Sequence, residues 1–142
     1  MTMTTLTHSV TLPDDYNRAD FLSFHQRDRQ AFAEQVTANS LKKGMFWQRK
    51  PACLSIDFVA DKAHAQLILD AEPDSTSAQA KDWPAWLKYF LGLEQPTQSF
   101  FKQHHQHAEL GPLIQRHPGL RVAQVSSPFE AITWAIIGQQ IS

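Results

Sequence analysis

The first half of the chain alternates between apolar and polar residues, a period of two that is typical of β-strands. Residues 6–12 follow this pattern and predict a half-buried strand that ends at Pro13. Residues 54–58 and 67–69 follow it again on either side of a connection at 60–63, which predicts a hairpin. The polar face of this hairpin should carry Ser55, Asp57, Gln66 and Asp70.

The stretch between these strands combines a helix with two short strands. Asn17 can cap a helix over residues 18–28, because its side chain accepts hydrogen bonds from the free amides of the first turn. Residues 36–41 and 45–48 are short, partly apolar segments on either side of residues 42–44. The Lys-Lys-Gly composition of 42–44 favours a turn, so we expect two strands joined there.

After Pro73 the apolar period changes to that of a helix. The residues that share its face are Trp83, Trp86, Leu87, Phe90 and Leu91. Tryptophans can also stack on bases, but at this spacing they are more often core residues. Pro84 suits the first turn of the helix. Residues 95–117 predict one or two short helices, broken near Gly111 and Pro112.

The last segment carries the strongest local signal for a helix start. Ser127 can cap the helix, Pro128 suits its first position, and Glu130 completes a Ser-x-x-Glu capping box. An apolar stripe comes next, at Phe129, Ile132 and Ile136. The sequence stops at Ser142 without a glycine cap, so we expect a truncated chain.

Composition narrows the class of protein without naming a partner. The 142 residues, 42% of them hydrophobic, fit one globular domain with a second one begun. The net charge of −1 argues neither for nor against a nucleic-acid partner. The single cysteine, Cys53, has no partner for a disulfide, and neither a signal peptide nor an apolar run of membrane-spanning length occurs. We therefore expect a cytoplasmic protein.

The residue patterns of several common chemistries are missing or weak. His104, His105 and His107 cluster as zinc ligands do, but they lack a fourth ligand, and a glutamine-rich stretch is more simply a solvated surface. No serine or cysteine stands in a nucleophile elbow, and the five glycines are too isolated for a phosphate loop. We therefore expect no metal and no cofactor.

Three motifs near the carboxyl end occur in a distinctive order. They are Pro118-Gly119-Leu120-Arg121, then Pro128-Phe129-Glu130, then Gly138-Gln139-Gln140-Ile141-Ser142. This succession resembles the AlkA-type DNA-3-methyladenine glycosylase II branch of the helix-hairpin-helix glycosylases. The resemblance implies an AlkA-like α+β amino-terminal domain over residues 1–94, an antiparallel sheet with packed helices. The first helices of an all-α helix-hairpin-helix glycosylase domain would occupy residues 95–142.

The resemblance also implies an activity and a set of site residues. The family excises alkylated purines from damaged double-stranded DNA in base excision repair, and it flips the damaged base into an aromatic pocket. Phe24 is similar to the aromatic that the amino-terminal domain contributes to this pocket; a core phenylalanine is the other interpretation. Gln140 matches the side chain that is wedged into the duplex, and Gln139 would contact the DNA backbone or the helix end.

The family's helix-hairpin-helix motif and catalytic aspartate belong after Ser142, so no catalytic residue is assigned in this chain. Without that carboxylate nothing stabilises the positive charge that develops on the sugar, and the chain alone should not excise bases. The resemblance further implies a monomer at full length, in the cytoplasm with the nucleoid, and no membrane partner. The alternative is a non-catalytic interaction or regulatory domain. It predicts a stable fold at this length, whereas a fragment should expose the stripe Phe129, Ile132 and Ile136.

Overall fold

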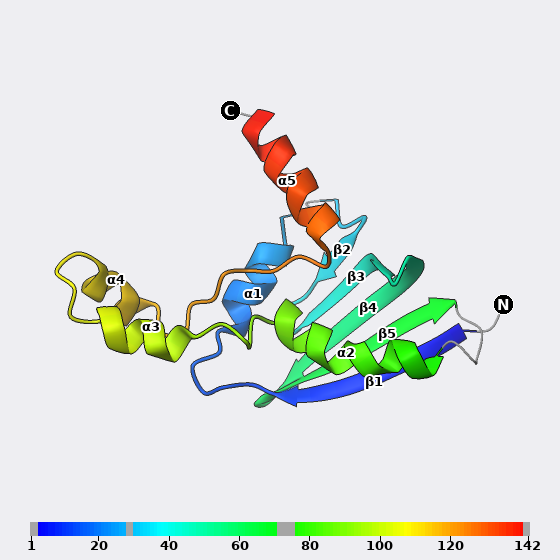
Figure 1. The fold of residues 1–142 in the computed structure, drawn as a ribbon, viewed down its shortest axis with the longest axis horizontal. Coiled ribbons are helices and arrows are strands. Elements are labelled where there is room, and N and C mark those ends of the chain that lie inside the picture. The colour runs from blue at the N-terminus through cyan, green and yellow to red at the C-terminus, as the bar shows by residue number, and fades with distance from the viewer. Residues whose placement is uncertain (1–2, 28–29, 71–75, 141–142) are drawn as a thin grey trace.

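The computed structural model describes residues 3–27, 30–70 and 76–140 and shows an α+β fold (Figure 1). The strands are β1 (Met3–Thr11), β2 (Glu34–Val36), β3 (Ser40–Trp47), β4 (Lys50–Val59) and β5 (Lys62–Asp70). The helices are α1 (Arg18–His25), α2 (Thr76–Phe90), α3 (Thr97–His104), α4 (Leu110–Arg116) and α5 (Pro128–Gln140). The strands form one antiparallel sheet in the order β1-β5-β4-β3-β2. The predicted α+β class, an antiparallel sheet with packed helices, is therefore confirmed.

The hairpin of β4 and β5 lies at the centre of the sheet and agrees with the prediction. Ala60 and Asp61 join the two strands, with Ala60 at a φ of +52°. Ser55 pairs with Gln66 on the polar face of the hairpin. The apolar residues of both strands alternate with these and point into the core: Leu54, Ile56, Phe58, Leu67 and Leu69. The same alternation places β1 where the sequence predicts it, although β1 begins three residues earlier.

The turn predicted at residues 42–44 is wrong, because β3 runs through them without interruption. The connection lies earlier, at residues 37–39, where the Thr37 amide donates to the Ser40 carbonyl. The period of two explains the difference, because four alternate residues of β3 face the core: Leu41, Lys43, Met45 and Trp47. A lysine thus occupies an inward position of a regular strand. Composition favoured a turn here, but the buried lysine finds charged partners inside the molecule.

α2 packs across one face of the sheet (Figure 1). Its buried residues are those that helical spacing predicts, Trp83, Leu87 and Phe90, with Leu91 directly after it. The rings of Trp83, Trp86 and Phe90 stack in series, with centroid distances of 5.5 and 4.9 Å. The interpretation of Trp83 and Trp86 as core residues is therefore confirmed, Trp86 being partly buried.

Two predicted details of helix ends are wrong. Pro84 lies inside α2, where it removes one backbone hydrogen bond, and burial of the aromatic residues around it outweighs that local cost. The break between α3 and α4 falls at residues 105–109, while Gly111 and Pro112 lie in the first turn of α4. Proline fits there because first-turn amides have no partner within the helix. Nδ1 of His107 accepts hydrogen bonds from two amides at the start of α4, and so begins the helix.

The start of α1 agrees with the prediction. The side chain of Asn17 accepts hydrogen bonds from the amides of Ala19 and Asp20, at 3.0 and 3.3 Å. α1 ends at His25, and Asp28, the predicted last residue, lies outside the described residues. α1 therefore begins where its cap predicts and is shorter than its apolar pattern suggests.

Candidate functional site

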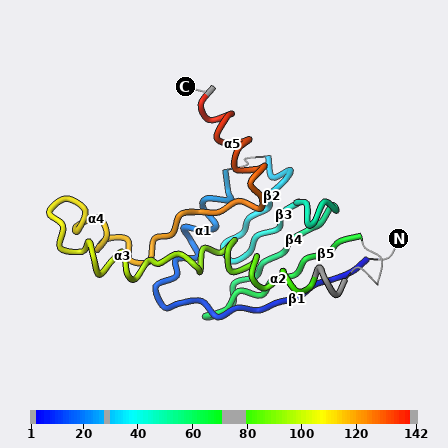
Figure 2. The backbone as a smooth tube through the Cα atoms, viewed as in Figure 1, coloured from blue at the N-terminus to red at the C-terminus, as the bar shows by residue number. Residues whose placement is uncertain are grey.

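The connector, residues 117–127, carries the chain from α4 back along α1 to α5, which projects from the sheet (Figure 2). As predicted, Ser127 caps α5, because its Oγ accepts a hydrogen bond from the Glu130 amide at 3.2 Å. The second half of the capping box differs from the prediction. Glu130 Oε2 accepts from the amide and the hydroxyl of Ser126, at 3.0 and 2.5 Å. The glutamate therefore fixes the residue before the cap and presents its other oxygen to the sheet.

Lys43 joins the start of α5 to the sheet. Its ammonium group donates to Glu130 Oε1 at 2.8 Å and to Glu34 Oε1 on β2. Nδ1 of His25 lies 3.2 Å from the same Glu34 oxygen. Only 4% of the Lys43 side chain is exposed, so the two carboxylates offset the cost of burying its charge. These four residues, the Lys43 cluster, tie α1, β2, β3 and α5 together.

The Lys43 cluster also controls the protonation of its carboxylates. Burial raises the pKa of Glu34, but hydrogen bonds from His25 and Lys43 and the Lys43 charge outweigh burial and lower the pKa below its usual value. Burial likewise raises the pKa of Glu130, and hydrogen bonds from Lys43 and Ser126 with the Lys43 charge reverse that effect. Both glutamates are therefore negatively charged at neutral pH.

The motif at residues 118–121 packs against the loop before α1. Gly119 has a φ of +70° and lies so close to the Asp15 carbonyl that a Cβ would overlap that oxygen. Arg121 donates from Nη2 to Asp15 Oδ1 at 3.1 Å and from Nη1 to the Gly119 carbonyl at 2.6 Å. Its guanidinium carbon lies 5.1 Å from the ring centroid of Tyr16. Burial raises the pKa of Tyr16, and the Arg121 charge partly opposes that rise. The motif thus has a structural role in holding the connector.

Two further side chains hold the connector near its middle and at its end. The Gln95 side-chain amide donates to the Val122 carbonyl at 2.7 Å and accepts from the Val122 amide at 2.8 Å. Trp86 Nε1 donates to the Ser126 carbonyl at 3.3 Å. Because Trp86 belongs to the ring stack of α2, the start of α5 is fixed both to the sheet and to α2.

A pocket of about 360 Å³ lies between α1 and the connector. Phe24 is half-buried and lines this pocket. Other walls come from Tyr16, Phe21, Phe90 and connector residues 119–124. Asp20 adds a carboxylate, which forms no ion pair with a side chain of the described residues. An aromatic pocket with an unpaired negative charge suits a planar ligand that is electron-poor or cationic.

The ring of Phe24 is in contact with a cation from its own helix end. The guanidinium carbon of Arg27 lies 3.8 Å from the Phe24 ring centroid, and Arg27 Nε donates to the Phe24 carbonyl at 2.8 Å. The same guanidinium carbon lies 5.2 Å from the ring centroid of Trp134 on α5. One planar cation is therefore shared by aromatic rings from α1 and α5.

No protein-family model and no curated protein matches this chain. Within residues 3–27, 30–70 and 76–140, no helix is long and apolar enough to cross a membrane.

Sequence reasoning missed the contacts of Lys43, Arg27 and Arg121. Lys43 alone left a signal, as a charged residue at an inward position of an alternating strand.

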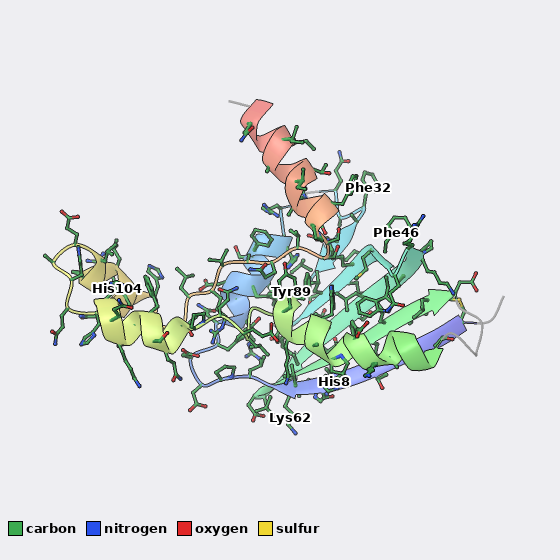
Figure 3. The ribbon with its side chains drawn as sticks, viewed as in Figure 1. His8, Phe32, Phe46, Lys62, Tyr89 and His104 are labelled. Atoms are coloured by element: carbon green, nitrogen blue, oxygen red, sulfur yellow. The ribbon has the colours of Figure 1, made fainter. Side chains whose placement is uncertain are left out.

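The three histidines that cluster in the sequence have separate local roles. His104 lies 4.7 Å from the Phe100 ring and His105 lies 5.5 Å from the Phe101 ring, while His107 begins α4. Figure 3 shows His104 on α3, away from both the sheet and α5. In the described part of the chain, no three potential metal ligands come together.

A second pocket, of about 610 Å³, lies among α3, α4 and the connector. Its walls are mainly apolar and include Phe100, Phe101, Leu113 and Ile114. Connector residues 119–122 line both this pocket and the pocket beside Phe24. Neither Phe24 nor Gln139 lines it.

From its first turn onward α5 is mostly apolar and exposed. Phe129 is 81% exposed, and Ile132 and Ile136 are also exposed, as the interpretation of the chain as a fragment predicts. Gln139 is exposed near the end of α5, and the side chain of Gln140 lies outside the described residues. The roles of these two glutamines at DNA therefore stay predictions.

Proposed function

We propose that the chain is the amino-terminal part of a DNA glycosylase that excises alkylated purines, of the 3-methyladenine type, in base excision repair. Residues 1–94 are then its α+β domain, and residues 95–142 are the first helices of an all-α helix-hairpin-helix glycosylase domain. The observation that supports this most is the contact between α1 and α5. α5 carries the second of the three glycosylase-like motifs and the start of the third, and the Arg27 guanidinium contacts both Phe24 and Trp134.

The surface of α5 supports the same proposal. A helix that is apolar on all sides is typical of the interior of a domain, and α5 exposes phenylalanine, isoleucine and tryptophan side chains around its axis. In the proposed enzyme, the remaining helices of the glycosylase domain cover these side chains. An interaction or regulatory domain would also present an exposed apolar helix, but it gives no reason for an aromatic pocket beside Phe24.

The proposed mechanism divides the work between this chain and the rest of the enzyme. Alkylated purines are cationic and electron-poor, so a flipped base of this kind is favoured by stacking on Phe24. Gln140 fills the gap left in the duplex, and Gln139 contacts the DNA backbone. The sugar becomes positively charged as the base leaves, and a carboxylate must stabilise that charge. In the proposal this is an aspartate outside the 142 residues, so the chain alone does not excise bases.

The direct test compares this chain with a longer form that includes the coding sequence after Ser142. Both are incubated with methylated duplex DNA, and released 3-methyladenine is measured by chromatography. We expect release by the longer form and none by the chain of 142 residues. Excision by the short chain, or its absence in the longer form, contradicts the proposal.

Two variants of the longer form test the site itself. Phe24→Ala should lower kcat/KM for base release about tenfold, which is the usual cost of losing one stacking contact with a base. Phe46→Ala is the matched control, because this phenylalanine is exposed on the outward face of β3. If the two variants are equally active, Phe24 does not contribute to the proposed base pocket.

A further inference from the structure

Two cations of the α+β part of the molecule hold α5, which projects from the sheet (Figure 1). At the first turn of α5, the buried ammonium group of Lys43 donates a hydrogen bond to Glu130 Oε1 at 2.8 Å. One turn later, the guanidinium carbon of Arg27, which follows α1, lies 5.2 Å from the ring centroid of Trp134. We call these two contacts the α5 clamp.

Both contacts of the α5 clamp lie on one side of the helix. Glu130 and Trp134 are four residues apart, so they are separated by only about 40° around the helix axis. The same geometry places Ile132, Ile136 and Gln139 on the opposite side. The exposed fractions agree, because Trp134 is 48% exposed, whereas Ile132 is 59% and Ile136 57% exposed.

The second contact restricts motions that the first one allows. A helix held only at its start can rotate about its axis and swing about that point. Apolar burial does not prevent this, because among the described residues none from α5 belongs to the buried core. Rotation of the helix would, however, carry Trp134 away from Arg27. The α5 clamp therefore determines which side of the helix faces outward.

Arg27 is itself fixed by α1. Its Nε donates a hydrogen bond to the Phe24 carbonyl at 2.8 Å, and its guanidinium carbon lies 3.8 Å from the Phe24 ring centroid. A guanidinium is planar and keeps its charge at any pH at which the chain is folded. Arg27 thus presents a cation to Trp134 from a position that α1 sets.

We propose that Arg27 is a positioning residue for DNA binding, which together with Lys43 turns Gln139 outward. The choice of DNA as the partner rests on the proposed function, in which Gln139 contacts the DNA backbone. Arg27 acts through Trp134 and makes no contact with a phosphate. Loss of its contact lowers the fraction of molecules in which α5 has this orientation. The apparent affinity for DNA then falls by the same factor.

The first test measures the orientation of α5 in the chain of 142 residues. Spin labels are attached at Gln139→Cys and Lys62→Cys, two exposed positions, in a Cys53→Ser background that removes the exposed native thiol. Double electron–electron resonance then gives the distances between the end of α5 and the start of β5. We expect a narrow distribution that broadens with Arg27→Gln. A distribution that is equally broad without this substitution overturns the inference.

Two further variants of the labelled chain complete the first test. Glu130→Gln keeps an oxygen that can accept from Ser126 and removes the charge that Lys43 binds, so it should also broaden the distribution. Arg18→Gln removes an exposed arginine at the start of α1 and should leave the distribution unchanged. Broadening by Arg18→Gln as large as that by Arg27→Gln would contradict a specific role of the clamp.

The second test measures DNA binding by the longer form, using fluorescence anisotropy and a duplex with an abasic site. Arg27→Gln should weaken binding about twofold to fivefold, the range of one exposed cation–π contact. The salt dependence should stay the same, because loss of a phosphate contact would lower its slope by about one. In a Trp134→Leu background, Arg27→Gln should have no further effect. A lower slope, or a full effect without the tryptophan, overturns the inference and makes Arg27 a phosphate ligand.

Failure of the inference is distinct from failure of the proposed function. If Arg27→Gln broadens the distance distribution but the longer form neither binds the duplex nor excises bases, the glycosylase is refuted and the α5 clamp still orients the helix. If the longer form excises bases and Arg27→Gln changes neither the distribution nor the affinity, the glycosylase stands and the positioning role of Arg27 is refuted.

Discussion

α2 and α5 are both rich in tryptophan and other apolar residues, but the apolar residues of α2 are buried and those of α5 are exposed. Trp83 of α2 is 2% exposed and sits in the ring stack on the sheet, whereas Trp134 of α5 is 48% exposed. α2 is held by apolar burial of its second half, at Trp83, Leu87 and Phe90. α5 is held near its start by polar and ionic contacts. Lys43 and Ser126 donate hydrogen bonds to Glu130, and the Trp86 indole donates to the carbonyl of Ser126, just before the helix.

The difference shows that apolar content alone does not place a helix. α2 and α1 already cover the apolar face of the sheet, and among the described residues none from α5 belongs to the buried core. What positions α5 is directional, since a buried lysine and a capped first turn fix where the helix begins. The packing of α2 should therefore lose most stability when its rings are truncated. The start of α5 should lose most when charges or backbone contacts are changed.

Truncating one tryptophan in each helix is the strongest test of this contrast. Trp83→Ala should lower the free energy of unfolding by about 3–5 kcal/mol, because it empties a fully buried site. Trp134→Ala should cost less than about 1 kcal/mol, because its ring is half exposed. Urea denaturation followed by circular dichroism measures both. Losses of similar size would show that α5 is as well packed as α2.

Removing the lysine that joins the two regions should have the next largest effect. Lys43→Met leaves Glu34 and Glu130 without their cation inside the molecule and should cost about 2–3 kcal/mol. Lys42→Met, on the exposed face of the same strand, should change stability by less than about 0.5 kcal/mol. Adding Glu34→Gln and Glu130→Gln to Lys43→Met should restore part of the loss. No restoration would mean that the lysine acts through packing of its side chain.

A substitution in the connector should lower the free energy of unfolding by a smaller amount, for steric reasons. Gly119→Ala should cost about 2 kcal/mol, because it adds a Cβ at a positive φ against the Asp15 carbonyl. Gly138→Ala is the matched change in α5, where no atom lies within 4 Å of the added Cβ. It should leave the fold intact and stabilise it by up to about 1 kcal/mol through helix propensity. Thermal unfolding measures the stability of both variants. If Gly119→Ala costs no stability, the connector is not closely packed on the loop before α1.

Low pH should have the smallest and most local effect, which is to destabilise the start of α5. The pKa values of Glu34 and Glu130 are lowered in the folded state, so their stabilisation is present above the ordinary glutamate value of 4.5. It is lost as pH falls through their folded pKa values below 4.5. Hydrogen exchange at the Ser126 amide, which donates to Glu130, should quicken in that range beyond its intrinsic pH dependence. Glu130→Gln should flatten this step, and an unchanged step would assign it to another carboxylate.

Features that depend on neighbours in sequence could be predicted. The β4–β5 hairpin, the buried face of α2 and the caps at Asn17 and Ser127 each follow from a few adjacent residues and a fixed period. Residues 42–44 show the limit of this reasoning. Their composition favours a turn, and the partners of Lys43 explain how the strand continues with a lysine facing inward.

The contacts that build the candidate site join residues far apart in the chain. Lys43 and Glu130 are 87 residues apart, and Arg121 and Asp15 are 106 apart. A single sequence offers no period that links such pairs. Phe24 could be named by resemblance, and the structure places it beside a pocket. No pattern in the sequence predicts that Arg27 contacts the rings of both Phe24 and Trp134.

The parallel rings of Trp83 and Trp86, 5.5 Å apart with an interplanar angle of 17°, have an optical consequence. Indole transitions this close couple to one another, so the pair should give a chiral signal in the near ultraviolet that separate tryptophans do not produce. Because Trp86 also donates to the carbonyl of Ser126, that signal reports from the boundary between the sheet layer and the projecting helix. The chain thus carries its own spectroscopic probe of whatever comes to cover α5.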